Sequence, residues 1–190
     1  MSKAVLESLS KKFGDEVILE TFDAHGDDTA VVAPAKIAEV CTFLKSDAAM
    51  SFEMISDVTC VDWLGQDPRF EVVYHLYSVT KKHRVCLKCR LSEDAAKLPS
   101  VTPVWKGANW FEREAYDMYG VVFDGHPDLR RILLYPEFVG HPLRKDYPLD
   151  GEQPLVEMRD PESQRPVMPS GTANLVSLGR PDRTEPGKEG

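Results

Sequence analysis

The first apolar residues of the chain recur at helical spacing, on one face of a predicted helix. These residues are Val5, Leu6, Leu9 and Phe13. Gly14 follows directly, where a helix commonly ends. The pattern therefore predicts a first helix that stops just before residue 14.

The next segment changes from strand-like to helix-like spacing. Residues 16–22 and 29–33 are rich in β-forming residues, and the polar stretch between them is typical of a turn. Pro34 suits the first position of a helix. Apolar residues at helical spacing then predict a second helix over residues 35–46. They are Ile37, Val40, Cys41 and Leu44.

Three longer β-rich runs follow, over residues 51–64, 69–80 and 83–91. The stretches between them, residues 65–68 and 81–82, are short enough to be hairpin connections. Helices followed by hairpin-linked strands predict an α+β fold, with the helices packed on a mainly antiparallel sheet.

Proline changes this pattern in the second half of the chain. Ten of the 14 prolines lie from Pro127 onward, which disfavours long regular elements there. Residues 151–190 contain no aromatic residue and cannot bury enough apolar surface to form a core of their own. We therefore predict an α+β domain over residues 1–98, a helix with turns over 99–150, and an extended proline-rich tail over 151–190 that wraps a partner.

The charge balance limits the partners. The chain has 31 acidic and 23 basic residues, a net charge of −8, which disfavours binding to nucleic acid. Its longest apolar stretch, residues 30–35, is far shorter than the roughly 18 residues that a membrane span needs. Glu7 stands where a signal peptide would be apolar. These features predict a cytoplasmic chain.

Two of the four cysteines have the C-x-x-C spacing of metal and redox sites. Cys86 and Cys89 lie in a run of alternating apolar and polar residues, which is typical of a strand. Positions three apart on a strand point to opposite faces, and no second cysteine pair completes a zinc site. We therefore favour reduced, packed cysteines over a metal or redox site.

Residues 107–120 have the pattern of a capped helix. Asn109 is placed to cap its start, and Glu112 can reach back to that cap. Gly120 suits the left-handed turn that ends many helices. One face of this helix is predicted to be apolar. Its members are Phe111, Ala115, Met118 and Tyr119.

The carboxylates of this helix are candidates for acid–base chemistry or metal binding. Glu112 and Glu114 are two positions apart, however, and so do not converge on a helix. A carboxylate-bridged metal site would also need a Glu-x-x-His motif, which the helix lacks. Arg113 and Asp117 are four apart and can pair. We therefore favour a structural role for this helix.

A short motif occurs twice after the helix. Residues 125–131 and 140–146 each begin with Gly-His-Pro and continue to a pair of basic residues. The two histidines could contribute to a metal site, but no third ligand has a fitting spacing. We predict two rigid turns whose cations pair with the 112–117 helix or with an acidic partner surface. These cations are Arg130, Arg131, Arg144 and Lys145.

Three blocks of residues carry a resemblance, in the order 110–120, 123–133 and 140–148. Together they resemble the C subunit of NADH-quinone oxidoreductase, a soluble component of respiratory complex I that related plastid and hydrogenase complexes share. The dense part of the match covers residues 107–148, and the α+β order of residues 1–98 fits the family's N-terminal domain. The resemblance assigns fold-forming and interface roles to the matching positions. They are Trp110, Glu112, Arg113, Glu114, Asp117, Gly120, His126, Pro127, Arg130, Arg131, His141, Pro142, Arg144, Lys145 and Asp146.

The resemblance implies a non-catalytic assembly subunit in the peripheral arm of a proton-translocating NADH:quinone oxidoreductase. Its expected partners are the D subunit, which is the large subunit beside the quinone cavity, and the B and I subunits. It implies no catalytic, cofactor-binding or metal-binding residue on this chain, with FMN and iron–sulfur clusters on partner subunits. The expected location is the cytoplasmic side of the inner membrane, with membrane contact only through the complex.

Three other functions remain open from the sequence. The chain could be the equivalent subunit of an energy-converting hydrogenase or formate-linked complex, which uses the same fold. It could also be a stand-alone carboxylate–histidine metalloenzyme, which stoichiometric tightly bound metal would indicate. The third alternative is a generic binding module that makes short-lived contacts through its tail.

Overall fold

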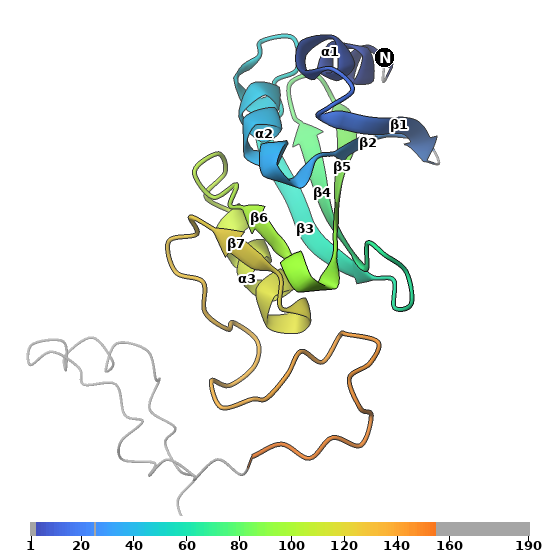
Figure 1. The fold of residues 1–190 in the computed structure, drawn as a ribbon. Coiled ribbons are helices and arrows are strands. Elements are labelled where there is room, and N and C mark those ends of the chain that lie inside the picture. Colours follow the sequence, from blue (N-terminus) through green and yellow to red (C-terminus); the bar gives the residue numbers. More distant parts are fainter. Residues whose placement is uncertain (1–2, 25, 155–190) are drawn as a thin grey trace, which may run out of the picture. The chain divides into compact units, whose positions relative to one another are not determined.

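The computed structural model describes residues 3–24 and 26–154 (Figure 1). Within these residues, three α-helices form where apolar residues recur at helical spacing. They are α1 (Lys3–Phe13), α2 (Ile37–Ser46) and α3 (Ala108–Tyr119). Two short 3-10 helices are η1 (Pro34–Lys36), which leads into α2, and η2 (Glu93–Ala95). The N–H of Gly14 closes the end of α1 on the carbonyl of Ser10, at 2.9 Å.

Five strands form the main sheet in the order β1-β2-β5-β4-β3. They are β1 (Ile18–Ala24), β2 (Asp27–Val32), β3 (Met54–Asp62), β4 (Phe70–Ser78) and β5 (His83–Leu91). Neighbours are antiparallel except β2 and β5, which pair in parallel. The long connection through α2, β3 and β4 supplies the crossover that a parallel pair needs. The predicted α+β fold with a mainly antiparallel sheet is confirmed.

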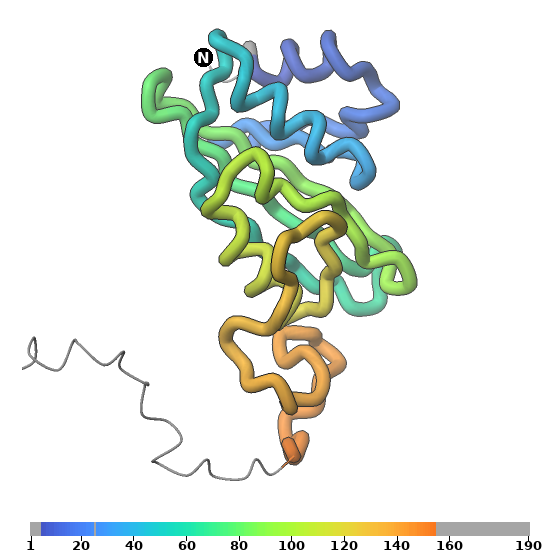
Figure 2. Tube along the Cα trace, turned by 90° about the vertical axis from the view of Figure 1, so that its left-hand side faces the viewer, coloured from blue at the N-terminus to red at the C-terminus, as the bar shows by residue number. Residues whose placement is uncertain are grey.

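The core lies between one face of this sheet and the first two helices (Figure 2). Alternate residues of the central strands point to this face, as the period of a strand requires. Tyr74 on β4 and Leu87 on β5 are fully buried there, together with Leu9 from α1 and Leu44 from α2. The helices therefore stabilise the sheet by covering its apolar face.

The third helix packs against the edge strand β3. Two short strands, β6 (Lys97–Pro99) and β7 (Val122–Asp124), form a separate parallel pair and bring the two ends of the α3 region together. Residues 125–154 then contain neither helix nor strand, as their proline content predicts. This segment belongs to the same compact unit as the sheet.

Most elements match the sequence prediction, but the first strands begin elsewhere. The predicted strand 16–22 starts at Ile18, because a turn joins the Ile18 N–H to the carbonyl of Gly14 at 3.0 Å. The strand predicted at 29–33 starts at Asp27, which pairs with Ala24 across the hairpin. Backbone pairing across the hairpin thus extends β2 to polar residues that a search for apolar β-forming residues does not include.

The cysteines and the helices bear on two further predictions. Cys86 and Cys89 lie on β5, and all four cysteines are free and buried, as predicted. Across residues 3–24 and 26–154, every helix is too short or too polar to cross a membrane. The predicted tail over 151–190 lies, from residue 155 onward, outside the described residues.

Candidate functional site

The start of α3 differs from the predicted cap. Gly107 occupies the N-cap position without a side-chain hydrogen bond, and Asn109 lies inside the helix. A turn directly precedes α3, so the N–H of Asn109 donates to the carbonyl of Lys106 at 3.3 Å. Because the preceding turns satisfy these N–H groups, the Asn109 cap and its bond from Glu112 were wrong predictions.

Glu112 instead binds the loop that precedes the helix. Its carboxylate accepts hydrogen bonds from the Ser100 hydroxyl at 2.6 Å, the Val101 N–H at 2.7 Å and the Thr102 hydroxyl at 3.1 Å. The side chain is fully buried. Burial raises the pKa of Glu112, and the three hydrogen bonds only partly oppose this. Glu112 therefore joins α3 to the 100–102 loop from inside the protein.

The first Gly-His-Pro turn packs against this carboxylate. His126 is buried, and its Nε2 lies 4.0 Å from Glu112. The Nδ1 of His126 accepts the Asp128 N–H at 3.0 Å, so Nε2 carries the proton and donates to the carbonyl of Asn109 at 3.2 Å. The ring thus fixes the turn to α3, while Pro127 lies exposed beside it.

The Glu112→Gln variant is expected to change how stability depends on pH. Because the pKa of Glu112 is raised on folding, the folded chain holds this proton more tightly than the unfolded chain. The contribution is present below the ordinary pKa of 4.5 and is lost as pH rises through the folded pKa. The advantage of the wild type over Glu112→Gln in free energy of unfolding should therefore shrink as pH rises from about 4 to 7. Denaturant unfolding at several pH values measures this difference in free energy of unfolding. Exposed Glu114 supplies the control, Glu114→Gln, and an advantage that grows with pH would contradict the assignment.

Asp117 organises the chain after the first turn. One carboxylate oxygen accepts three successive backbone N–H groups, those of residues 132–134, at 2.9–3.1 Å. The other accepts Nη1 of Arg131 at 2.7 Å. Burial raises the pKa of Asp117, but the Leu134 N–H, Arg131 and the other two N–H groups outweigh it and hold the pKa below its usual range. A buried, ionised Asp117 therefore fixes the path of residues 131–134.

One arginine near this segment has the predicted kind of partner, and two have other partners. Arg131 pairs with Asp117, which confirms a pairing between these cations and the helix. Arg113 does not pair with Asp117, because its guanidinium donates to the carbonyls of Arg130 and Arg131, each at 3.1 Å. Arg130 pairs at the surface with Asp128. The first basic pair thus contains one half-buried and one exposed arginine.

The second Gly-His-Pro turn closes the C-terminal end of α3. Gly120 ends the helix with φ +81°, as predicted. The carbonyl of Asp117 accepts Nδ1 of His141 at 3.0 Å, and that of Tyr119 accepts Nε of Arg144 at 2.7 Å. Burial lowers the pKa of His141. These side chains, with half-buried Pro142 between them, satisfy carbonyls that the helix end leaves open.

Two residues that sequence reasoning missed anchor the end of this turn. They are Arg69 and buried Asp62. Arg69 donates two hydrogen bonds of 2.9 Å to Asp62 and one of 2.7 Å to Asp146. Asp62 accepts the backbone N–H of Lys145 at 2.8 Å as well. The hydrogen bonds from Arg69 are the largest influence on Asp62, and they lower its pKa. The sequence signal that could have indicated this pair is the opposite charge of Asp62 and Arg69, which flank the 65–68 hairpin connection.

These anchors leave large apolar side chains pointing outward. We call residues 129–149 the docking segment. Leu133 is 63% exposed although the adjacent backbone is held by buried Asp117. Exposed apolar side chains that gather on one segment mark an interaction surface. Other members in the segment are Tyr135, Val139, Leu143 and Leu149, and Trp110 on α3 is exposed as well.

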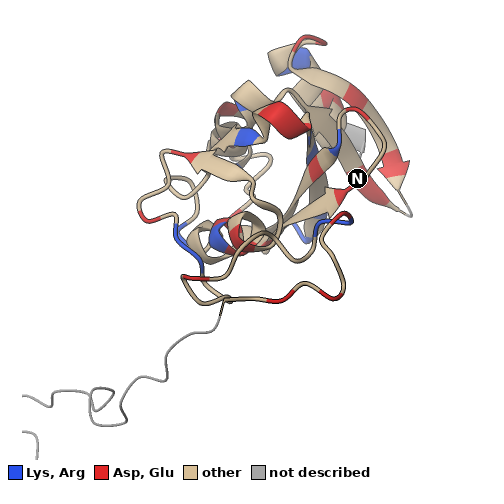
Figure 3. Ribbon diagram, turned by 60° about the horizontal axis from the view of Figure 1, so that its bottom comes forward, with Lys and Arg blue, Asp and Glu red and all other residues tan. Residues whose placement is uncertain are grey.

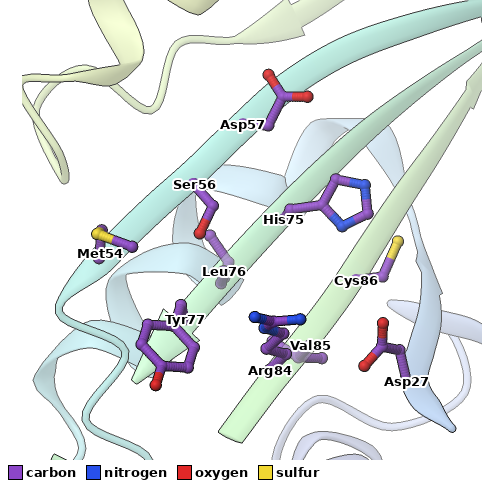
Figure 4. Close-up of a pocket in the computed structure, with 10 residues that line it drawn as sticks. All are labelled: Asp27, Met54, Ser56, Asp57, His75, Leu76, Tyr77, Arg84, Val85 and Cys86. Carbon is purple, nitrogen blue, oxygen red and sulfur yellow. The ribbon is translucent and has the colours of Figure 1, made fainter. Parts of the chain in front are cut away.

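The open face of the sheet carries a groove with different chemistry (Figure 4). Asp57, His75 and Cys86 stand in one cross-strand row on β3, β4 and β5. Burial raises the pKa of Cys86, so its thiol is not activated as a nucleophile. No group of His, Cys, Asp or Glu side chains among residues 3–24 and 26–154 is arranged to hold a metal ion.

Comparison with known proteins defines the family. Residues 30–153 match the family described as "Respiratory-chain NADH dehydrogenase, 30 Kd subunit", and the chain belongs to it. It is 46% identical over 177 residues to a C subunit of NADH-quinone oxidoreductase, the one numbered 2, of Rhizobium etli, covering 93% of this chain and 94% of that one. It is 52% identical over 145 residues to the C subunit of Caulobacter vibrioides, covering 76% and 72%. The predicted resemblance is confirmed.

Two solved structures share the fold. A trypsin-resistant fragment (1–134) of Nqo5 matches with a TM-score of 0.58 and 32% identity, covering 67% of this chain and 98% of the fragment. A component of a membrane-bound sulfane sulfur reductase, an archaeal respiratory membrane complex, matches with a TM-score of 0.64 and 26% identity, covering 77% of this chain and 85% of that one. This chain is thus of a subunit type found in multi-subunit respiratory complexes.

Proposed function

We propose that this chain is a non-catalytic assembly subunit of the peripheral arm of NADH:quinone oxidoreductase. The observation that carries the proposal is the docking segment, where buried charged anchors hold a backbone whose apolar side chains face outward. Such an arrangement suits a preformed interface, because little ordering is left to oppose binding. Family membership gives the complex in which this interface works.

The partners in this proposal are the D subunit, beside the quinone cavity, and the B and I subunits. FMN and the iron–sulfur clusters lie on partner subunits, and this chain supports electron transfer to quinone by holding those subunits together. The complex places it at the cytoplasmic side of the inner membrane, with membrane contact only through other subunits. The exposed Leu133 and Val139 support a protein partner at the docking segment.

A second candidate is the equivalent subunit of an energy-converting hydrogenase-type complex. The similarity in fold to a component of the archaeal sulfane sulfur reductase supports it, because that complex is a respiratory membrane complex of another kind. Identity of 46–52% to C subunits of NADH-quinone oxidoreductase favours the NADH-linked complex over this alternative.

Purification through a tag on the full chain, followed by mass spectrometry of the bound proteins, tests the proposal. We expect stable recovery of the D, B and I subunits together with the NADH-oxidising flavin subunits. Recovery of nickel-site subunits would favour the hydrogenase-type complex. Recovery of the tagged protein alone, with one equivalent of tightly bound metal, would contradict an assembly role and favour a metalloenzyme.

The extended tail over residues 151–190 remains a prediction. From residue 155 onward it lies outside the described residues. Its apolar residues are spread between prolines and glycines, a composition suited to an extended strap on a partner. They include Leu155, Val156, Met158, Val167, Met168, Leu175, Val176 and Leu178.

A further inference from the structure

The hairpin between β3 and β4 ends in a tip that exposes two large apolar side chains. Trp63 is 45% exposed and Leu64 is 52% exposed. The tip is a closed turn, since the Trp63 N–H donates to the Arg69 carbonyl at 2.8 Å and the Gln66 N–H to the Trp63 carbonyl at 2.9 Å. Exposing a tryptophan and a leucine to water on an ordered tip is unfavourable. Neighbouring exposed apolar residues of this kind are typical of a contact site.

The base of the tip is rigid for a separate reason. Arg69 is nearly buried and binds three carboxylates, those of Asp62, Glu93 and Asp146. These groups come from the hairpin, from η2 and from the docking segment, so they lock the three together. In Figure 1 the hairpin accordingly projects beside the end of the docking segment. The tip is therefore held in place before any partner arrives, which favours binding.

The surroundings of the tip are acidic. Three carboxylates around one guanidinium leave that cluster with a charge of −2, from +1 and −3. Asp67 on the tip and Asp94 in η2 are exposed and add two negative charges, which exposed Lys145 and the guanidinium of Arg144 offset, so the net charge stays at −2. Arg90, which lines the groove beside Trp63 and Asp67, pairs with Glu71. Figure 3 shows acidic and basic positions along the loops of the chain.

We propose that residues 63–68, with the acidic groups around Arg69, form a second docking surface that receives a basic, apolar segment of a partner subunit. Charge complementarity selects this occupant, because lysine or arginine side chains suit the carboxylates while an apolar residue covers Trp63 and Leu64. The same negative charge disfavours an anionic membrane surface. This inference rests on the proposed assembly function and adds a second contact surface to it.

Site-specific photo-cross-linking in the assembled complex tests the surface. A photoreactive residue replaces Leu64 in the full chain, Leu133 in a second version and Leu19 in a third. Leu19 is 58% exposed on the edge strand β1 and serves as a matched control. We expect the residue at position 64 to cross-link to a Lys- or Arg-rich peptide of a partner subunit, and the residue at 19 to give no comparable product.

A charge-reversal variant tests whether the acidic groups around the tip are needed for the contact. Asp67→Lys with Asp94→Lys should reduce the cross-link at position 64 roughly tenfold, and added salt should reduce it in the wild type. Asp15→Lys with Glu16→Lys makes the same change in charge at exposed positions of the α1–β1 turn and should have little effect. An undiminished cross-link in the first variant would overturn the basic partner.

The positions separate this inference from the proposed function. A cross-link at 133 without one at 64 would overturn the second surface and leave the assembly role intact. A cross-link at 64 only to lipid would also overturn it. Absence of partner cross-links at both positions would count against the assembly function itself.

Discussion

Replacing Asp117 by asparagine is expected to accelerate hydrogen exchange at the amides of residues 132–134 by roughly a hundredfold or more. The variant keeps the side-chain shape but removes the charge and replaces one oxygen by an NH₂ group. Either the three backbone N–H groups or Arg131 then loses its acceptor. Removing one partner of a buried pair costs about 3–5 kcal/mol. Each 1.4 kcal/mol is about tenfold in the population of the opened segment. Mass spectrometry of exchanged peptides measures this effect.

Neighbouring arginines supply a matched control for the same measurement. Arg131→Met should also accelerate exchange, because Arg131 is only 18% exposed and bonds to Asp117 and to the carbonyl of Gly140. Arg130→Met should have little effect, since Arg130 is 73% exposed and its surface pair with Asp128 contributes about 0–1 kcal/mol. Equal exchange in the two variants would contradict the role given to Asp117.

Alanine at Gly120 is expected to lower the free energy of unfolding by about 2–5 kcal/mol. Part of this loss comes from φ +81°, a left-handed conformation that costs other residues about 1–2 kcal/mol. The rest comes from crowding, because a Cβ at this position would lie 2.6 Å from Nε2 of His141 and 2.8 Å from Nη2 of Arg144. Moving these side chains would break their bonds to the carbonyls of α3. Denaturant unfolding measures the loss.

Gly125 separates the two causes. It has the same φ of +81°, but nothing lies within 4 Å of a Cβ built there. Gly125→Ala should therefore lose only the conformational part, about 1–2 kcal/mol. Similar losses in the two variants would show that the close packing of His141 and Arg144 on Gly120 does not matter for stability.

Local sequence patterns predict the strands of the sheet well. They fail for features that depend on the direction from which the backbone enters an element. The strand over residues 83–91 was predicted with its observed ends, because alternation and a short connection mark both of them. The Asn109 cap was wrong, because turns before α3 already satisfy its first N–H groups. A cap depends on how the backbone arrives at a helix, which spacing alone does not contain.

The contacts around α3 were predicted in kind but not in detail. Spacing and composition indicated that cations near the helix would pair with it, and Arg131 with Asp117 confirms this. The contact between Arg69 and Asp146 joins residues 77 positions apart, and no local pattern indicates it. Arg113 shows the same limit, since carbonyls of the folded-back segment compete with Asp117 for its guanidinium.

We propose that the docking segment assembles the complex and takes no part in catalysis. The most direct test of this proposal is the Leu133→Asp variant of the full chain in its native host, with Leu19→Asp as the control. Assembled complex on native gels and NADH:quinone turnover per assembled complex are both measured. We predict less assembled complex with unchanged turnover per complex for Leu133→Asp, and normal values for Leu19→Asp. Normal assembly with slowed turnover in Leu133→Asp would contradict the account and point to a catalytic role.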